Sequence, residues 1–211
     1  MSTSIPAERM QDPPKLRVFL AGATGVIGMR LLPLLLADGQ TVAGMTRSGE
    51  KVDQLRALGA EPVVCDVFDV DAVTRAVMTF QPDAVIHQLT DLPNDVAQLS
   101  DFAPRNDRMR AEGTRNLVAA AKQAGARHLL AQSIAWRPPD RGEIVDHHER
   151  QVLDAGGVVV RYGRLYGPGT FYEAQVPPPP RIHVDAAAQA TPPLIQAPSG
   201  VVVLAEEAHD D

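Results

Sequence analysis

The sequence lacks the residues from which disulfides, zinc sites and nucleic-acid-binding surfaces are usually built. Its 211 residues include a single cysteine, Cys65, which excludes an internal disulfide, and no cysteine–histidine cluster suggests structural zinc. Acidic side chains outnumber basic ones by 26 to 20, so the formal net charge is −6. This balance excludes the overall basic surface typical of nucleic-acid-binding domains. We therefore expect no metal site and no nucleic-acid partner.

Long apolar segments are missing as well. The longest apolar run, residues 31–37, contains Pro33 and is far too short to cross a bilayer. Residues 1–14 mix serine, proline and acidic side chains and lack the apolar core of a signal peptide. Hydrophobic residues nevertheless make up 45% of the chain and charged residues 22%, which is typical of globular domains. We expect a soluble, cytoplasmic protein without a membrane partner.

From Lys15 onward, short apolar runs alternate with segments of helical length. This alternation predicts an α/β fold, namely a Rossmann-type, doubly wound parallel sheet of six or seven strands with helices on both faces. Ser48 is the expected N-cap of the second helix. The expected strands are 16–21, 41–46, 62–65, 84–87, 128–133, 158–161 and 201–204, and the expected helices are 25–37, 49–58, 69–80, 105–124 and 146–155.

Proline marks a change of character toward the C-terminus. Eight of the 18 prolines lie between Pro168 and the end of the chain, and four of them are consecutive at 177–180. A tetraproline is typical of a loop or of polyproline II structure. We therefore divide the chain into a flexible lead (1–14), a main α/β domain (15–170) and a Pro-rich C-terminal tail (171–211).

A glycine-rich motif lies where the first predicted strand ends and the first predicted helix begins. Gly22, Gly25 and Gly28 form a G-x-x-G-x-x-G loop. In such a loop the first glycine permits a tight turn, the second lets a pyrophosphate approach the backbone, and the third lets the helix pack on the strand. The motif predicts dinucleotide binding; the alternative is a tight turn that binds nothing. The candidate binding residues are Gly22, Thr24, Gly25, Val26, Ile27 and Gly28.

The residue after the second predicted strand indicates which dinucleotide is bound. A carboxylate at this place takes the ribose 2′-hydroxyl of NAD, whereas an arginine suits the 2′-phosphate of NADP. Here the residue is Arg47, and a guanidinium can bind a phosphate through two hydrogen bonds. We expect NADP in preference to NAD. The alternative is a solvated surface arginine in a chain that has seventeen of them.

Besides the glycine-rich loop, five shorter segments form a recognisable set in this order: 46–47, 65–67, 110–117, 132–135 and 161–169. Together with residues 22–28 they resemble the NAD(P)-dependent epimerase/dehydratase family, the extended or atypical branch of the short-chain dehydrogenase/reductase superfamily. The resemblance covers about residues 15 to 185, which implies that 15–170 is an NAD(P)-binding Rossmann domain and 171–211 the remnant of a substrate lobe.

The resemblance implies roles for individual residues. Asp66 would accept a hydrogen bond from the adenine amino group, with the Val67 backbone beside it; otherwise Asp66 caps a helix. Ser133 would position a substrate carbonyl or hydroxyl. Tyr162 would close over the nicotinamide, or else pack in the core. The turn that would line the ribose and nicotinamide consists of Gln88, Leu89 and Thr90, although relatives usually have smaller residues there.

The chain departs from the family at the catalytic pair. Relatives that transfer a hydride generally use Tyr-x-x-x-Lys, in which the lysine and the cofactor lower the tyrosine pKa. The only tyrosines are Tyr162, Tyr166 and Tyr172, and no lysine follows Lys122, so this pair is absent. The substrate lobe is also shortened: only twelve residues separate Thr170 from the segment 183–185, and the chain stops at Asp211.

Histidines are the remaining candidates for acid–base chemistry. Among His147, His148 and Glu149 at most one can face a site, because adjacent helical residues point about 100° apart. We expect all three to form a solvated helix face; the alternative is an acid–base role for one of them, and His147 is the candidate. Their spacing does not suit a metal. His87 ends a predicted strand, and we expect a hydrogen-bonded core histidine there.

Two functions are consistent with these residues. The first is an epimerase/dehydratase-like oxidoreductase that uses NADP and acts, with weak or atypical catalysis, on an unidentified small molecule such as a nucleotide sugar. The second is a non-catalytic NADP(H)-binding sensor or regulatory protein. Relatives often dimerise through a four-helix bundle, which implies a homodimer.

Overall fold

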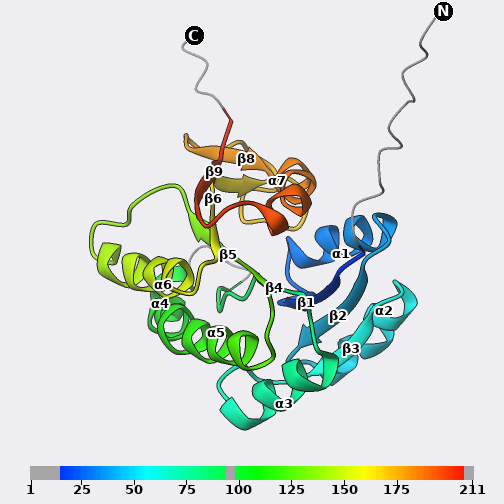
Figure 1. The fold of residues 1–211 in the computed structure, drawn as a ribbon. Coiled ribbons are helices and arrows are strands. Elements are labelled where there is room, and N and C mark those ends of the chain that lie inside the picture. Colours follow the sequence, from blue (N-terminus) through cyan, green and yellow to red (C-terminus); the bar gives the residue numbers. More distant parts are fainter. Residues whose placement is uncertain (1–14, 94–97, 207–211) are drawn as a thin grey trace, which may run out of the picture.

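The computed structural model describes residues 15–93 and 98–206, and a seven-stranded parallel sheet forms its centre (Figure 1). The strand order is β3-β2-β1-β4-β5-β6-β9. The order reverses beside β1, which is where doubly wound sheets bind ligands. The strands are β1 (Arg17–Ala21), β2 (Thr41–Thr46), β3 (Glu61–Val64), β4 (Ala84–His87), β5 (His128–Ile134), β6 (Val158–Tyr162) and β9 (Gly200–Leu204).

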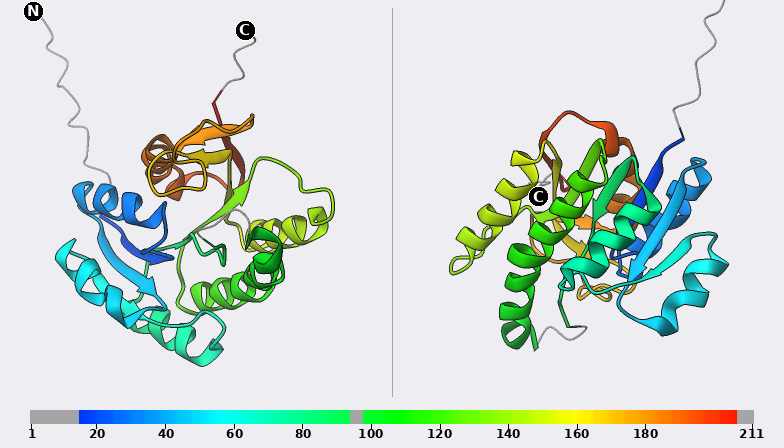
Figure 2. Two further views of the ribbon diagram at one scale, coloured as in Figure 1. Left: turned by 180° about the vertical axis from the view of Figure 1, so that it is seen from behind. Right: turned by 60° about the horizontal axis from the view of Figure 1, so that its bottom comes forward.

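Helices cover both faces of the sheet (Figures 1 and 2) because neighbouring residues of each strand point to opposite sides. In β1, Val18 and Leu20 pack into one core cluster, while Phe19 and Ala21 pack into the other. The first cluster is completed by α1 (Gly28–Ala37), α2 (Val52–Ala57) and α7 (Val184–Ala190), and the second by α3 (Val70–Phe80), α5 (Thr114–Gln123) and α6 (Gly142–Asp154). The predicted Rossmann-type fold is confirmed.

Several element boundaries differ from those predicted. The first helix begins at Gly28 rather than Gly25, because residues 22–27 form the turn. Ser48 makes no side-chain cap; the backbone enters α2 through a 3₁₀ segment, η1 (Gly49–Lys51). The predicted helix 105–124 is longer and is interrupted: α4 (Leu99–Arg108) contains Pro104, and a π-helical segment, η3 (Met109–Gly113), leads into α5.

The region after β6 contains more regular structure than its prolines indicate. Two short strands, β7 (Arg164–Tyr166) and β8 (Arg181–His183), form a separate parallel pair, and a 3₁₀ segment, η4 (Pro192–Gln196), follows α7. The predicted strand at 201–204 is confirmed as β9, which pairs with β6 in the main sheet. The tetraproline is a loop. The predicted lead 1–14 lies outside the described residues.

Among the described helices, none has the length and hydrophobicity needed to span a bilayer.

Candidate functional site

The turn between β1 and α1 has a different steric requirement at each glycine. Gly22 has φ +88°, a left-handed conformation that favours glycine, and a Cβ there would lie 2.8 Å from the Gln88 backbone. A Cβ on Gly28 would lie 2.1 Å from the carbonyl oxygen of Gly22. Gly25 is exposed, and a Cβ there would meet only that same oxygen, at 3.3 Å. These surroundings fit a tight turn at Gly22, an open approach for a ligand at Gly25 and close helix packing at Gly28.

The amides of the turn fit an anionic ligand. Within the described residues, the amides of Thr24, Val26 and Ile27 donate to no acceptor, and Ile27 immediately precedes α1. Unpartnered amides at the positive end of a helix dipole attract anions, and the first turn of α1 contains no acidic residue that would oppose them. The turn can therefore hold the pyrophosphate of a nicotinamide dinucleotide.

Side chains that follow β2 and β4 meet near this turn. The hydroxyl oxygens of Thr24 and Thr46 lie 3.1 Å apart, which ties the turn to the end of β2. Arg47 is 44% exposed and lies 3.5 Å from the almost buried carboxylate of Asp91. This carboxylate also accepts two hydrogen bonds from Arg105 of α4. Sequence reasoning identifies Arg47 but misses Asp91 and Arg105, since neither belongs to a motif.

The residues predicted for the adenine end lie directly after β3. Asp66 is exposed, and one of its carboxylate oxygens accepts a hydrogen bond from the Phe68 amide at 3.0 Å. Val67 is buried, and its carbonyl accepts a hydrogen bond from Asn116. Asp69, not Asp66, caps α3 by accepting from the Ala72 amide. The Asp66 carboxylate is thus accessible to a ligand, and its contact with adenine stays a prediction.

Two residues predicted for the nicotinamide side are buried and bonded to each other. Gln88 donates through Nε2 to the Tyr162 hydroxyl at 3.2 Å, and this hydroxyl lies 2.7 Å from that of Thr191. Burial raises the pKa of Tyr162 by more than these two hydrogen bonds lower it, so the net pKa lies above its ordinary value. Leu89 is half-buried and Thr90 is exposed. In this arrangement Leu89 and Thr90 are more accessible to a ligand than Gln88 and Tyr162.

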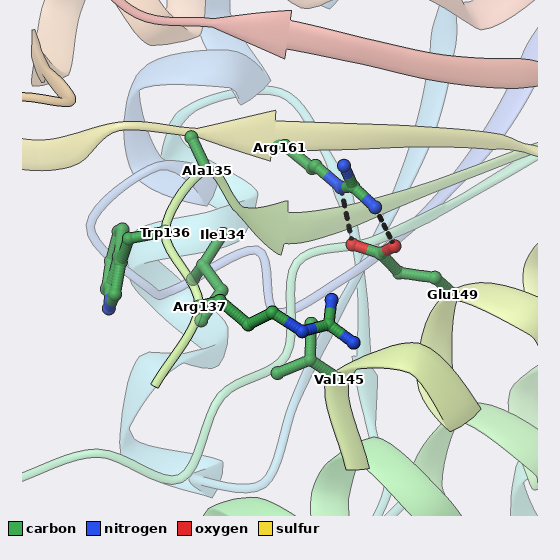
Figure 3. A pocket seen from close by; sticks show the side chains of 7 residues that line it. All are labelled: Ile134, Ala135, Trp136, Arg137, Val145, Glu149 and Arg161. Carbon is green, nitrogen blue, oxygen red and sulfur yellow. Dashed lines mark hydrogen bonds and ion pairs between the residues drawn. The ribbon is translucent and has the colours of Figure 1, made fainter. Parts of the chain in front are cut away.

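Ser133 lies near the end of β5 and contacts the ion pair of Glu149 and Arg161, which Figure 3 shows. Its hydroxyl donates to Glu149 Oε1 at 2.6 Å, and Arg161 donates to the same carboxylate through Nε at 2.9 Å and Nη2 at 2.5 Å. Burial raises the pKa of Glu149, but the hydrogen bonds from Arg161 and Ser133 lower it more, so the net pKa lies below its ordinary value. The hydroxyl proton of Ser133 is therefore held by a carboxylate.

We expect Glu149→Gln to lower the free energy of unfolding by about 1–2 kcal/mol, because Arg161 loses its charged partner. Arg161 is 35% exposed, so solvent screens part of this loss. Urea denaturation at neutral pH measures the change. Glu143→Gln is the matched control, since Glu143 is exposed on the same helix. Equal stability of the two variants would contradict a stabilising Glu149–Arg161 pair.

A second buried cluster joins β4, α5 and α6. The Leu89 amide donates to His87 Nδ1 at 3.2 Å, which leaves His87 Nε2 to donate to the Thr114 hydroxyl at 3.0 Å. His148 Nε2 donates to the Gln132 carbonyl at 2.8 Å, so its Nδ1 accepts from Thr114, also at 2.8 Å. Every ring nitrogen is satisfied with both imidazoles neutral. The expected hydrogen-bonded core histidine at position 87 is confirmed.

The expectation of a solvated face on α6 is wrong for two of its three residues. His148 and Glu149 are 1% and 4% exposed, whereas His147 is exposed. Val145, His148, Glu149 and Val152 are all buried and have the spacing i, i+3, i+4, i+7 of one helix face. From the sequence, this spacing could have predicted that His148 and Glu149 are buried. An acid–base role for His147 stays a prediction.

A cavity of about 140 Å³ lies beside the Ser133 cluster (Figure 3). Arg137, which is paired with Asp146, also lines a second cavity of about 630 Å³. Asp107 lines the second cavity, and within the described residues its Oδ1 is buried without a hydrogen-bond partner. The first cavity is lined by Ile134, Ala135, Trp136, Arg137, Val145, Glu149 and Arg161.

Comparison with known proteins agrees with this geometry. Residues 22–155 match the profile of a family described as NAD(P)H-binding. A 3-diazoavenalumate denitrifying reductase from Streptomyces is 39% identical over 186 residues, covering 74% of this chain and 59% of that protein. A UDP-glucose 4-epimerase from Mycolicibacterium smegmatis is 30% identical over 128 residues, covering 56% of this chain and 38% of the epimerase. The chain thus spans less than two thirds of these relatives.

Among solved structures, the UDP-glucose 4-epimerase of Thermus thermophilus in complex with NAD is similar with a TM-score of 0.70. The match covers 90% of this chain and 77% of the epimerase at 20% identity. At this identity the similarity concerns the fold alone.

Proposed function

Because this chain belongs to the family of NAD(P)H-binding proteins and has the fold of the extended short-chain dehydrogenases/reductases, we propose that it is an NADP-dependent oxidoreductase acting on a small molecule. The observation that carries this proposal is the exposed Gly25 beside the amides of Val26 and Ile27, which have no acceptor among the residues that the structure describes. The reductase and epimerase among its relatives support an oxidoreductase activity.

The bound cofactor supplies hydride transfer at its nicotinamide ring. The chain contributes binding and orientation: the amides of Val26 and Ile27 hold the pyrophosphate, and Arg47 binds the 2′-phosphate. The cavity at the ends of β5 and β6 admits the substrate, with Trp136 and Arg137 as its walls. None of the three tyrosines lines this cavity, so no phenol is positioned there to exchange a proton with the substrate. Because a positioned acid or base accelerates proton transfer, we expect slow turnover without such a tyrosine.

A second function, an NADP(H)-binding sensor without turnover, is favoured by the state of Ser133. Its hydroxyl is buried and donates to Glu149, so it is not available to a substrate. Absorbance of the reduced nicotinamide, followed over a panel of carbonyl and nucleotide-sugar substrates, separates the two functions. Oxidation of NADPH by any substrate supports the enzyme, and binding without oxidation supports the sensor. The predicted homodimer stays a prediction.

Titration of the protein with NADPH and with NADH, followed by nicotinamide fluorescence, tests the proposed cofactor. We expect Arg47→Glu to weaken NADPH binding at least about tenfold, because a carboxylate repels the 2′-phosphate, and to leave NADH binding nearly unchanged. Arg56→Glu is the control, since Arg56 forms an exposed pair with Asp53 on α2. If neither nucleotide binds to the unmodified protein, the proposed function is wrong.

A further inference from the structure

Two arginines converge on one carboxylate between the ends of β2 and β4. Asp91 Oδ1 lies 3.5 Å from Nη2 of Arg47 and accepts a hydrogen bond from Nη2 of Arg105 at 3.2 Å. Arg105 Nε donates to the other carboxylate oxygen at 3.3 Å. The Asp91 side chain is 9% exposed, whereas those of Arg47 and Arg105 are 44% and 54% exposed. The three side chains leave an excess of one positive charge at the surface.

The position of this cluster relates it to the glycine-rich turn. Arg47 follows β2 directly, and Asp91 lies four residues beyond the end of β4. Since β1 lies between β2 and β4 in the sheet, the Arg47–Asp91 contact spans the end of β1, where the turn begins. A dinucleotide whose pyrophosphate lies on the turn would have its adenosine ribose beside this contact.

The two arginines are held with different strength. Arg105 makes two hydrogen bonds to Asp91, and the Asp91 amide donates to Asn106 at 3.1 Å, so that Asp91 is fixed to α4. Arg47 makes a single contact at 3.5 Å, the limit of a hydrogen bond. An incoming anion can therefore displace Asp91 from Arg47 more readily than from Arg105.

We propose, on the basis of the proposed NADP function, that Asp91 and Arg105 determine the choice between NADP and NAD together with Arg47. Asp91 holds Arg47 beside Arg105 before the nucleotide binds. The 2′-phosphate, which has more oxygens and more charge than a carboxylate, takes the place of Asp91 at Arg47 and accepts from the exposed edge of Arg105. The uncharged 2′-hydroxyl of NAD cannot compete with Asp91, so the Arg47–Asp91 contact persists when NAD binds.

This arrangement predicts opposite effects of two substitutions on NADPH binding. Arg105→Gln removes one phosphate ligand and is expected to weaken NADPH binding about tenfold, with NADH binding within twofold of the unmodified protein. Asp91→Asn removes the competing charge and is expected to tighten NADPH binding severalfold. If these residues had only a structural role, each substitution would change the affinities for NADPH and NADH in the same direction. Such a role could come from the packing of Arg105 over the Phe102 ring at 4.5 Å.

The experiment measures dissociation constants of NADPH and NADH by fluorescence, and those of adenosine 2′,5′-bisphosphate and AMP by calorimetry, for the unmodified full chain and each variant. The matched controls are Arg127→Gln and Asp83→Asn, which break an arginine–carboxylate pair of 2.8 Å near the opposite ends of β4 and β5. The bisphosphate should follow NADPH, and AMP should follow NADH.

Equal changes for both nucleotides in Arg105→Gln, or weaker NADPH binding in Asp91→Asn, would overturn the inference while leaving the proposed function intact. Equal binding of NADPH and NADH to the unmodified protein would overturn the inference together with the preference for NADP, but not the binding of a nicotinamide dinucleotide. Failure of the unmodified protein to bind either nucleotide would overturn the inference together with the proposed function.

Discussion

Replacing Gly25 by alanine is expected to abolish nucleotide binding and leave the fold intact, whereas replacing Gly28 by alanine is expected to destabilise the protein itself. A methyl group on Gly25 meets only the Gly22 carbonyl oxygen at 3.3 Å, so a small backbone shift accommodates it, but it occupies the surface that the pyrophosphate must approach. A methyl group on Gly28 would lie 2.1 Å from that oxygen and 2.9 Å from the Ala23 backbone. Such a clash is expected to cost about 3 kcal/mol or more.

Thermal unfolding with and without NADPH separates these effects. Gly25→Ala should melt close to the unmodified protein and show no shift with NADPH, whereas Gly28→Ala should melt well below it. Gly200→Ala is the control, because a Cβ there meets only Pro198, at 4.0 Å, in the edge strand β9. A Gly25→Ala protein that NADPH still stabilises would contradict pyrophosphate binding at this turn.

The sheet could be predicted from the sequence because parallel strands buried on both faces are continuous apolar runs. The runs that became β1, β4 and β6 are bounded by turn residues and alternate with helical segments, so their order and direction followed from the alternation. The pair β7–β8 could not be predicted in the same way. Each strand has three residues, and their pairing depends on a loop of prolines that brings distant segments together.

The helical segment 99–123 could not be fully predicted from the helix propensities of its residues. Pro104 and a polar composition argue against a helix before residue 105, yet α4 begins at Leu99. Tertiary contacts supply what the local sequence does not: Asn106 is buried and accepts from the Asp91 amide, and Arg105 pairs with Asp91. These partners come from another part of the chain, so the first turns of α4 could not be recognised from its own residues.

The candidate site was predictable where a motif carries it and not where charges pair across the fold. The three glycines and Arg47 are recognised by their spacing after the first strand. Glu149 and Arg161 are adjacent only because α6 packs on β5 and β6, and a carboxylate beside two histidines indicated a solvated surface. The periodicity of Val145, Glu149 and Val152 would have indicated burial, since they share one helix face.

The buried histidine pair is expected to make the protein unusually sensitive to mild acid. Burial, with a smaller contribution from the neighbouring His148, lowers the pKa of His87 from 6.5 to about 3, and burial also lowers that of His148. The two imidazole rings are nearly perpendicular with their centroids 5.5 Å apart, and Arg110 and Glu149 are charged groups near His148. Protonating His87 would place a second donor against the Leu89 amide, and protonating His148 would require the Thr114 hydroxyl to stop donating to it, so the folded protein resists protonation.

The direction of the pH dependence follows from proton binding in the two states. Below pH 6.5 an unfolded chain binds protons on these histidines that the folded chain does not, so the stabilisation is complete above this pH and is lost as the pH falls. For His87 the slope is about 1.4 kcal/mol per pH unit, or about 2 kcal/mol between pH 6.5 and 5, and His148 adds to it. Carboxylates with lowered pKa values, such as Glu149, change the stability only at lower pH. The pH dependence between pH 6.5 and 5 therefore comes from the histidines.

Urea denaturation at intervals between pH 7 and 5 measures this slope. His148→Gln should be less stable than the unmodified protein at pH 7, because its buried partners lose a matched ring, but its stability should depend less steeply on pH. His147→Gln is the matched control: His147 is exposed beside His148 on α6, so both the stability and the slope should equal those of the unmodified protein. If the stability of the unmodified protein is constant from pH 7 to 5, the two imidazoles accept protons in the folded state. The assignment of both imidazoles as neutral, derived from their hydrogen bonds, would then be wrong.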